Sequence, residues 1–263
     1  MSNFAHKTLK DLLDKGIVQL DDSILTICAS RSEHKLFQDL GFTNITISNL
    51  DQRVKPEEFA PYDWSYQDAQ NITFENNSFD FCFVKAGLHH CDSPHRGLLE
   101  MYRVARKGVI ALEARDSLAM RWAAHFNLVC TYEIEAVVRN DFACGGVNNT
   151  DVPNYVYRWT EREFEKTIDT HNPVGKHRYV YSHGLSLPYQ FAGMSKNPLK
   201  KLAVQILGPI IFVLTIPFKK QMNHFAMVAV KPSPPDDIWP WLEEAEAGYK
   251  ISRDYSQQRF KMK

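Results

Sequence analysis

Short apolar runs alternate with stretches of helical spacing along the first half of the chain. Four runs rich in β-branched and aromatic residues predict strands, and they lie at residues 23–28, 44–48, 79–84 and 109–112. Between these runs, residues 31–40 and 94–106 carry apolar residues at helical spacing, which predicts two helices. Gly41 is suited to end the first of them. This alternation with short links predicts right-handed crossovers and an α/β fold, with a mostly parallel sheet covered by helices on both faces.

The spacing changes in the second half of the chain. Residues 117–138 are predicted to be helical, and the glycine- and asparagine-rich stretch 145–154 is predicted to be a long loop. A further helix is expected to begin at Thr160, which has the spacing of a capping box with Glu163 three residues later. Two late strands are expected at 179–181 and 225–230.

The length of 263 residues suits one α/β domain that carries an insertion. We expect a single domain over residues 1–232, with the insertion at about 117–175, followed by a C-terminal tail over 233–263. A Ser-Pro-Pro run at the start of the tail marks the boundary, because proline cannot continue a central strand.

Composition narrows the class of protein. Lysine plus arginine and aspartate plus glutamate balance at 31 each, so no net field attracts nucleic acid and no nucleic-acid partner is expected. Five scattered cysteines without a C-x-x-C pair indicate reduced thiols. The first 20 residues lack the continuous apolar core of a signal peptide. Together these features favour a cytoplasmic protein.

An apolar run occupies residues 202–218 and is flanked by a pair of lysines on each side. A spanning helix needs about 20 apolar residues, and this run is shorter and contains Gly208, Pro209 and Pro217. Three interpretations stay open: a helix that is buried or forms a homodimer interface, peripheral contact with a membrane surface, and a spanning helix.

Three motifs follow one another in an order that is typical of one enzyme family. They are Ala29-Ser30-Arg31-Ser32 after the first strand, Asp68-Ala69 before Ser78-Phe79-Asp80, and Gly87-Leu88-His89-His90 at the exit of the strand 79–84. Over roughly residues 20–116 the chain resembles the class I S-adenosyl-L-methionine-dependent methyltransferases, of the type 11-like group. The resemblance implies a Rossmann-like sheet of seven strands with an antiparallel late strand, and S-adenosyl-L-methionine as the cofactor.

The resemblance also implies where the cofactor lies, because ligands of such sheets bind at the carboxyl ends of the strands. Asp51, or Asn49 if the second strand ends earlier, would accept the ribose hydroxyls, and Asp68 with the Ala69 backbone would bind adenine. The loops after the first strand and after the strand 79–84 would flank the methionine moiety. The expected cofactor contacts are therefore Ala29, Ser30, Arg31, Asn49, Asp51, Asp68, Ala69, Lys85 and Ala86.

The first loop departs from the family pattern, which has an acid in the strand and then G-x-G-x-G. Thr26 stands in place of the acid, and the three glycine positions hold Cys28, Ser30 and Ser32. Glycine at such positions permits positive φ and close backbone approach. Either the loop takes another path and still holds the cofactor, or the methionine end has lost its function and the protein binds something else.

Candidate catalytic residues are His89, His90 and Glu113, which lie at the exits of two neighbouring strands. An imidazole there would remove the proton of an acceptor hydroxyl; the alternative is a hydrogen-bonded structural histidine. Zinc is not expected at the His-His-Cys stretch, because adjacent residues at a strand exit would point apart instead of converging on one ion. The prediction for this site is no metal.

The insertion offers amide and aromatic side chains over residues 145–159, which suit recognition of a polar acceptor or simply tie the insertion to the sheet. We expect an S-adenosyl-L-methionine-dependent methyltransferase that methylates oxygen on a small or glycan-like acceptor. The alternative is a non-catalytic protein of the same fold that acts in binding or assembly.

Overall fold

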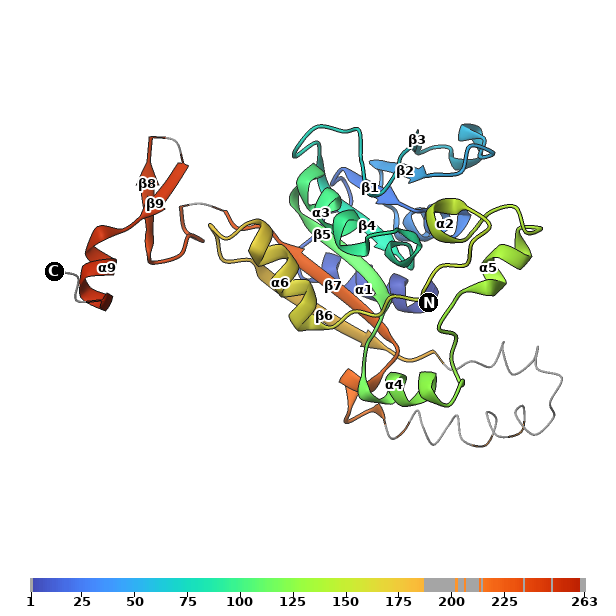
Figure 1. Ribbon diagram of the computed structural model, residues 1–263. Helices are drawn as coiled ribbons and strands as arrows, with labels where there is room; N and C mark the ends of the chain where they lie inside the picture. Colours follow the sequence, from blue (N-terminus) through green and yellow to red (C-terminus); the bar gives the residue numbers. More distant parts are fainter. Residues whose placement is uncertain are drawn as a thin grey trace.

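A computed structural model describes residues 2–186, 215–233, 235–246 and 248–260, together with Leu202, Ile206 and Val213. Its centre is a seven-stranded sheet in the order β3-β2-β1-β4-β5-β7-β6 (Figure 1). All neighbours pair in parallel except β7, which runs antiparallel to both β5 and β6. The strands are β1 (Ile24–Ile27), β2 (Ile45–Asn49), β3 (Asp63–Tyr66), β4 (Phe79–Lys85), β5 (Ala105–Ala114), β6 (Arg178–Gly184) and β7 (His224–Val230). The predicted mostly parallel α/β sheet of seven strands is confirmed.

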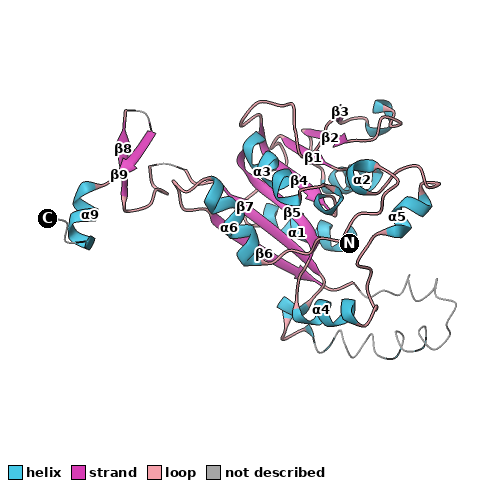
Figure 2. Cartoon of the chain, viewed as in Figure 1, coloured by secondary structure: helices cyan, strands magenta, loops and turns pink. Residues whose placement is uncertain are grey.

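Helices cover both faces of the sheet (Figure 2). On one face, α3 (Pro94–Val104) and α6 (Glu161–His171) pack into a core that includes Cys82 and Val84. On the other face, α1 (Ser2–Asp14) and α2 (Arg31–Leu40) pack into a second core with Phe81 and Phe83. Successive residues of β4 therefore point to opposite faces and are buried on both, which explains why this strand is apolar almost throughout.

Local signals in the sequence set several of these boundaries. The helix α2 begins and ends where its spacing predicts, and Gly41 ends it in the left-handed conformation with φ of 81°. Three short 3-10 turns join the elements: η1 (Pro56–Phe59), η2 (Leu88–His90) and η3 (Val147–Asn149). A fourth, η4 (Lys219–Gln221), precedes β7.

Two expectations about the second half need correction. The stretch 117–138 is not one helix but two, α4 (Leu118–His125) and α5 (Ile134–Arg139), because Asn127 adopts φ of 53° and turns the chain between them. Thr160 does cap α6 by accepting from the backbone of Glu163, but the Glu163 carboxylate is not part of a capping box. It contacts His95 and Tyr157 instead.

The tail has secondary structure of its own and extends away from the sheet (Figure 1). It forms the hairpin of β8 (Leu242–Ala245) and β9 (Gly248–Ile251), followed by α9 (Arg253–Phe260). The first part of the tail contacts the domain at Lys176. The backbone N–H of Lys176 donates to the Asp237 carbonyl at 2.7 Å, and the Lys176 ammonium lies over the Trp239 ring. The domain boundary at 232 stays a prediction.

The apolar segment 202–218 falls largely outside the described residues. Of its described side chains, Leu202, Ile206 and Val213 are more than half exposed, whereas Thr215 is buried. None of the helices that the structure describes is long and apolar enough to cross a membrane. Homodimer and membrane-surface contact through this segment stay predictions.

The carboxylate of Asp80 ties three strands together at the edge of the sheet where β1 and β4 begin. It accepts hydrogen bonds from the Ser23 backbone and hydroxyl, each at 3.0 Å, and forms ion pairs with Arg106 and Lys107. Burial alone would raise the pKa of Asp80, but these hydrogen bonds outweigh it and lower the pKa to about 2. Asp80 of the Ser-Phe-Asp motif therefore has a structural role, because it joins three strands.

We expect Asp80→Asn to lower the free energy of unfolding at pH 7 by about 2 kcal/mol, because the pKa of Asp80 rises to about 3.9 on unfolding. A lowered native pKa stabilises the fold above pH 4, and this contribution is lost as the pH falls towards 2. Urea denaturation should therefore show a gap between wild type and variant that closes below about pH 4. Asp63→Asn, at an exposed position of β3, is the control, and an equal loss of stability there would contradict the assignment.

Candidate active site at the carboxyl ends of the strands

The candidate site lies where the strand order reverses, between the carboxyl ends of β1 and β4. In open parallel sheets this is where ligands bind. Loops after β1, β2, β3 and β4 meet here, and the insertion between β5 and α6 returns over them. The expected cofactor and catalytic residues belong to these loops or to the adjoining strand ends, except Arg31, which is the first residue of α2.

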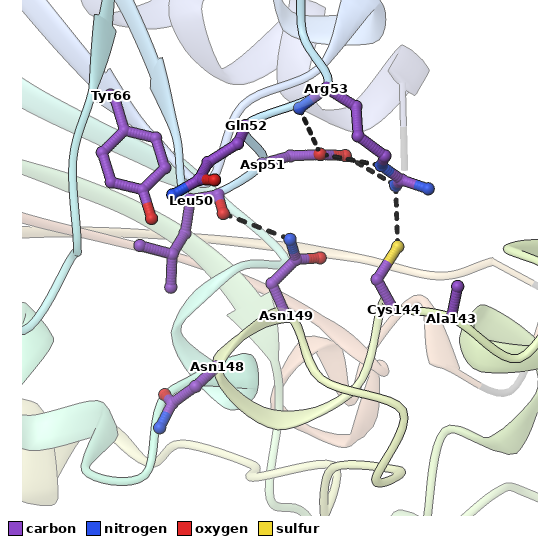
Figure 3. Close-up of a pocket in the computed structure, with 9 residues that line it drawn as sticks. All are labelled: Leu50, Asp51, Gln52, Arg53, Tyr66, Ala143, Cys144, Asn148 and Asn149. Carbon is purple, nitrogen blue, oxygen red and sulfur yellow. Dashed lines mark hydrogen bonds and ion pairs between the residues drawn. The ribbon is translucent and has the colours of Figure 1, made fainter.

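A cavity of about 330 Å³ opens beside the end of β2 (Figure 3). Its wall comes from the loop after β2, from β3 and from the insertion, and it consists of Leu50, Asp51, Gln52, Arg53, Tyr66, Ala143, Cys144, Asn148 and Asn149. The Asn149 amide donates to the Leu50 carbonyl at 3.2 Å, which holds the insertion against the loop. One side of this open cavity is therefore formed by a segment far away in the sequence.

Asp51 is the acidic side chain that lines this cavity. Its carboxylate accepts two hydrogen bonds from the Arg53 guanidinium, at 2.9 and 2.7 Å, and one from the Arg53 backbone. These hydrogen bonds lower the pKa of Asp51 against the opposing effect of burial. The same guanidinium contacts the Cys144 sulfur at 2.7 Å, so the acid at the end of β2 is positioned by an arginine that the insertion also contacts.

The other residues expected at the nucleoside end lie outside the cavity wall. The Asn49 amide donates to the Ala29 carbonyl at 2.7 Å and so joins the loops after β1 and β2. Asp68 accepts from the Gln70 backbone at 2.8 Å, and Ala69 beside it is buried. The structure thus places Asp51 at the cavity, while the adenine position of Asp68 and Ala69 stays a prediction.

The loops after β1 and β4, where the methionine moiety is expected, pack directly against each other. Cys28 adopts φ of 52°, and a Cβ added to Gly87 would lie 2.5 Å from the Cys28 Cβ. A hydrogen bond with Cys91 and burial together raise the pKa of the Cys28 thiol, so the thiol is neutral. Ala86 also has positive φ, at 52°, and donates from its backbone to the Leu112 carbonyl.

Side chains of α2 and β4 form an ion pair at the same end. Ser30 caps α2 in a complete capping box with Glu33, a Ser-x-x-Glu spacing that is not among the expectations from the sequence. The Lys85 ammonium lies 2.5 Å from the Glu33 carboxylate and 2.8 Å from the Ser32 hydroxyl, with both charged side chains at most 10% exposed. Burial alone would raise the pKa of Glu33, but the charge and hydrogen bond of Lys85 outweigh this effect, and the pKa is lowered. Arg31 points elsewhere and pairs with Glu58.

Glu113 organises the exit of β4. Its fully buried carboxylate accepts from the backbones of Gly87 and Leu88, at 2.9 and 2.8 Å, and pairs with His89 Nδ1 at 2.9 Å. His89 Nε2 lies 3.1 Å from the Glu133 carboxylate, which comes from the start of α5. The two candidate residues His89 and Glu113 are therefore in contact, as parts of a chain of hydrogen bonds that ends in the insertion.

His90 joins the same group. Its Nε2 lies 3.5 Å from the Glu133 carboxylate, and its Nδ1 lies 3.4 Å from the Gly146 carbonyl. The two imidazole centroids are 4.6 Å apart, so the expectation that the adjacent histidines point apart is wrong. The reason is local: residues 88–90 form the 3-10 turn η2, in which neighbouring side chains no longer alternate between opposite faces as they do in a strand.

The two histidines have opposite electrostatic environments. Burial alone would lower the pKa of His89, but Glu113 and Glu133 raise it to about 10. Burial and the neighbouring charge of His89 lower the pKa of His90. The two carboxylates on either side of His89 thus favour its charged form, whereas His90, which contacts one carboxylate and the Gly146 carbonyl, favours its neutral form.

Comparisons with known proteins agree with this architecture. Residues 32–112 match a family model described as a methyltransferase domain. This part of the chain is therefore similar to a methyltransferase domain. This match runs from α2 to β5 and ends one residue before Glu113. A comparison with curated proteins finds no match.

Solved structures show the same fold. The YcgJ protein of Bacillus subtilis is 9% identical with a TM-score of 0.52, over 87% of this chain and 99% of that one. A protein of Bacillus halodurans described as a methyltransferase is 12% identical with a TM-score of 0.51, over 86% and 100%. Magnesium protoporphyrin IX methyltransferase of Synechocystis, solved with bound S-adenosylhomocysteine, is 11% identical with a TM-score of 0.50, over 88% and 83%. At such identities the likeness concerns the fold alone.

No motif in the sequence indicates Glu133, which completes the histidine group. It lies 20 positions after Glu113 in a helical stretch without a motif, so its proximity arises only because the insertion turns back over the strand ends. Cys144 and Gln70 were missed for the same reason. The Gln70 side chain contacts the Asn148 amide and the Ser93 backbone, which joins the loop after β3 to both.

We expect Lys85→Met to lower the free energy of unfolding by about 3 kcal/mol, because it leaves the buried Glu33 carboxylate without its cation. The matched control is Lys35→Met, which removes an exposed pair with Asp39 and should cost less than about 0.5 kcal/mol. Urea denaturation measures both. The double variant Glu33→Gln/Lys85→Met should recover part of the loss, and equal stability of the two single lysine variants would contradict this role of the ion pair.

Proposed function

We propose that the protein is an S-adenosyl-L-methionine-dependent methyltransferase that methylates oxygen on a small or glycan-like acceptor. The observation that supports this most is the juxtaposition at one sheet edge of the cavity beside Asp51 and the polar group around Glu113. The bound cofactor would supply an electrophilic methyl group on a sulfonium. The residues of this chain would hold that cofactor, exclude water and receive the acceptor.

The nucleoside end fits such a cofactor. Asp51 faces the cavity with a carboxylate that can accept hydrogen bonds from ribose hydroxyls in addition to those from Arg53. The half-exposed ring of Tyr66 and the side chain of Leu50 supply apolar surface for a purine. A pocket with apolar walls and a few fixed polar groups is what small-molecule sites have in common.

The methionine end supports cofactor binding by another route than the usual glycines. Cys28 itself takes the left-handed conformation that a glycine would provide, and Gly87 on the facing loop leaves space for its side chain. Lys85 supplies a cation that would pair with the carboxylate of a methionine moiety while it keeps its contact with Glu33.

Methylation of a hydroxyl requires that its proton leaves. The group formed by His89, His90 and Glu133 is where the acceptor oxygen and its proton would be received. Glu113 would act as a positioning residue, because it contacts the backbone of the turn and the far nitrogen of His89. Much of the acceleration would come from alignment of the two reactants, which alone contributes several kcal/mol to such displacements.

The acceptor side is formed by the insertion. Most of its amides are engaged within the protein: Asn148 contacts Gln70 and Asp92, and Asn154 contacts Glu133. Tyr132 and Tyr155 are about half exposed and meet edge to face at 5.6 Å. Exposed aromatic rings beside a polar group suit an acceptor with an apolar face and hydroxyls, such as a sugar ring.

The alternative function is a non-catalytic binding or assembly protein of the same fold. The specific observation in its favour is the close contact of the loops after β1 and β4, together with the Lys85–Glu33 pair at that end. This alternative predicts that no S-adenosyl compound binds. The two functions are therefore separated by one binding measurement.

We expect S-adenosylhomocysteine to bind the protein in calorimetry, and Asp51→Asn to weaken binding at least about tenfold through loss of a charge-assisted hydrogen bond. Asp63→Asn, on the exposed edge strand, is the matched control and should leave the affinity unchanged. Absence of binding at high micromolar ligand would overturn the cofactor assignment and favour the non-catalytic alternative.

Asp68→Ala tests the adenine position separately. We expect weaker binding of S-adenosylhomocysteine, because Asp68 holds the turn with the Gln70 backbone beside the buried Ala69. Circular dichroism checks that the variant is folded. An affinity equal to that of the wild type would remove Asp68 from the site and leave Asp51 as the acid that contacts the nucleoside.

A further inference from the structure

We propose that His89, His90 and Glu133 bind a divalent first-row metal ion, for which Zn²⁺ is the probe. One ligand atom from each of the three residues lies within 4.8 Å of the other two. Within the part of the chain that the structure describes, this is the one group of histidine, cysteine and acidic side chains with that property. Two imidazoles and one carboxylate are a ligand set used by both zinc and non-haem iron sites.

The distances between ligand atoms agree with a common centre. Metal–ligand bonds of about 2.1 Å in a tetrahedral site place neighbouring ligand atoms about 3.4 Å apart. The Glu133 oxygen lies 3.1 Å from His89 Nε2 and 3.5 Å from His90 Nε2. Only small side-chain movements would bring the three atoms to an ion.

Each histidine is oriented through its other nitrogen. His89 Nδ1 faces the Glu113 carboxylate at 2.9 Å, and His90 Nδ1 faces the Gly146 carbonyl at 3.4 Å. Metal-bound imidazoles almost always donate their second N–H to a carboxylate or a backbone carbonyl, which fixes the tautomer and the ring plane. Both Nε2 atoms are thereby left to face Glu133, as a metal site requires.

The hydrogen-bond acceptors around His90 also favour a bound cation. When His90 donates its Nδ1 proton to the Gly146 carbonyl, its Nε2 lone pair faces the Glu133 carboxylate, which is also an acceptor. A cation between them satisfies both. At His89 the ion would take the place of the Nε2 proton, which is released to solvent, while the Nδ1 proton stays with Glu113.

Three protein ligands leave at least one coordination position for a water or for an oxygen of the acceptor. Magnesium is disfavoured, because it prefers oxygen ligands and two of the three here are imidazoles. The role of the ion rests on the proposed function. It would bind the acceptor hydroxyl and lower the pKa of that hydroxyl, so that its proton leaves to solvent before the methyl group is transferred. His90 is then a ligand and not the base. The sequence-based prediction of no metal is thereby revised.

The experiment measures binding of Zn²⁺ alone to the full chain after treatment with a chelator. Calorimetry should show about one equivalent bound with a dissociation constant below about 10 μM, and His90→Ala and Glu133→Gln should each weaken binding about 10- to 100-fold. The matched control is His95→Ala, because His95 also pairs with a glutamate, Glu163 at 3.1 Å, outside the group. It should leave the affinity unchanged.

A second measurement distinguishes the proposed ligands from the five cysteines. Co²⁺ in the same protein should give ligand-field bands without a thiolate-to-cobalt charge-transfer band, because the ligands are nitrogen and oxygen. Failure to bind Zn²⁺, a thiolate band, or undiminished binding in His90→Ala would each overturn the proposal. S-adenosylhomocysteine binding is measured separately without metal, so loss of either binding event leaves the other result standing.

Discussion

Three hydrogen bonds converge on the carboxylate of Glu113, which is fully buried at the end of β5. A buried carboxylate is costly unless such donors surround it. Here two of the donors are backbone N–H groups of the chain that leaves β4, so the charge determines where that chain turns. The third partner is His89, whose ring is thereby aimed at Glu133. The geometry of the candidate site follows from this one buried charge.

The insertion depends on the same turn. Glu133 and the Gly146 carbonyl contact the two histidines, and Asn148 reaches Gln70 and Asp92. These contacts all come from residues 133–148. The insertion can therefore lie over the strand ends in one arrangement only when the turn after β4 is already formed. Fold and site are thus coupled through side chains that belong to no common motif.

The pattern of apolar residues predicted six of the seven strands of the sheet, because most apolar residues of these six are buried in the two cores or pack against them. Phe81 to Val84 and Val109 to Leu112 are apolar on both faces because helices cover both faces of the sheet. The strand β3 was missed since Asp63 to Tyr66 form a partly exposed edge, where no core imposes a pattern. Asn127, which separates α4 from α5, has a conformation that asparagine tolerates but does not require.

The site was predicted in part for a related reason. Residues at strand ends, such as Asp51, His89 and Glu113, follow from topology, because parallel strands bring their carboxyl ends to one edge. Glu133 and Cys144 do not follow from it, since only the path of the insertion brings them there. The 3-10 turn that makes His89 and His90 converge is likewise set by long-range contact with Glu113, and no local signal in the sequence announces it.

The glycine-poor loop after β1 is best understood together with the loop it faces. In a G-x-G-x-G loop, glycine provides both positive φ and the absence of a Cβ at the point of close approach. Here these two properties are divided between the loops: Cys28 adopts the positive φ, and Gly87 lacks the Cβ. A Cβ at Gly87 would lie 2.5 Å from that of Cys28, so the two residues are matched as a pair. The loop after β1 therefore differs from that pattern, and Gly87 on the facing loop makes room for the Cys28 side chain.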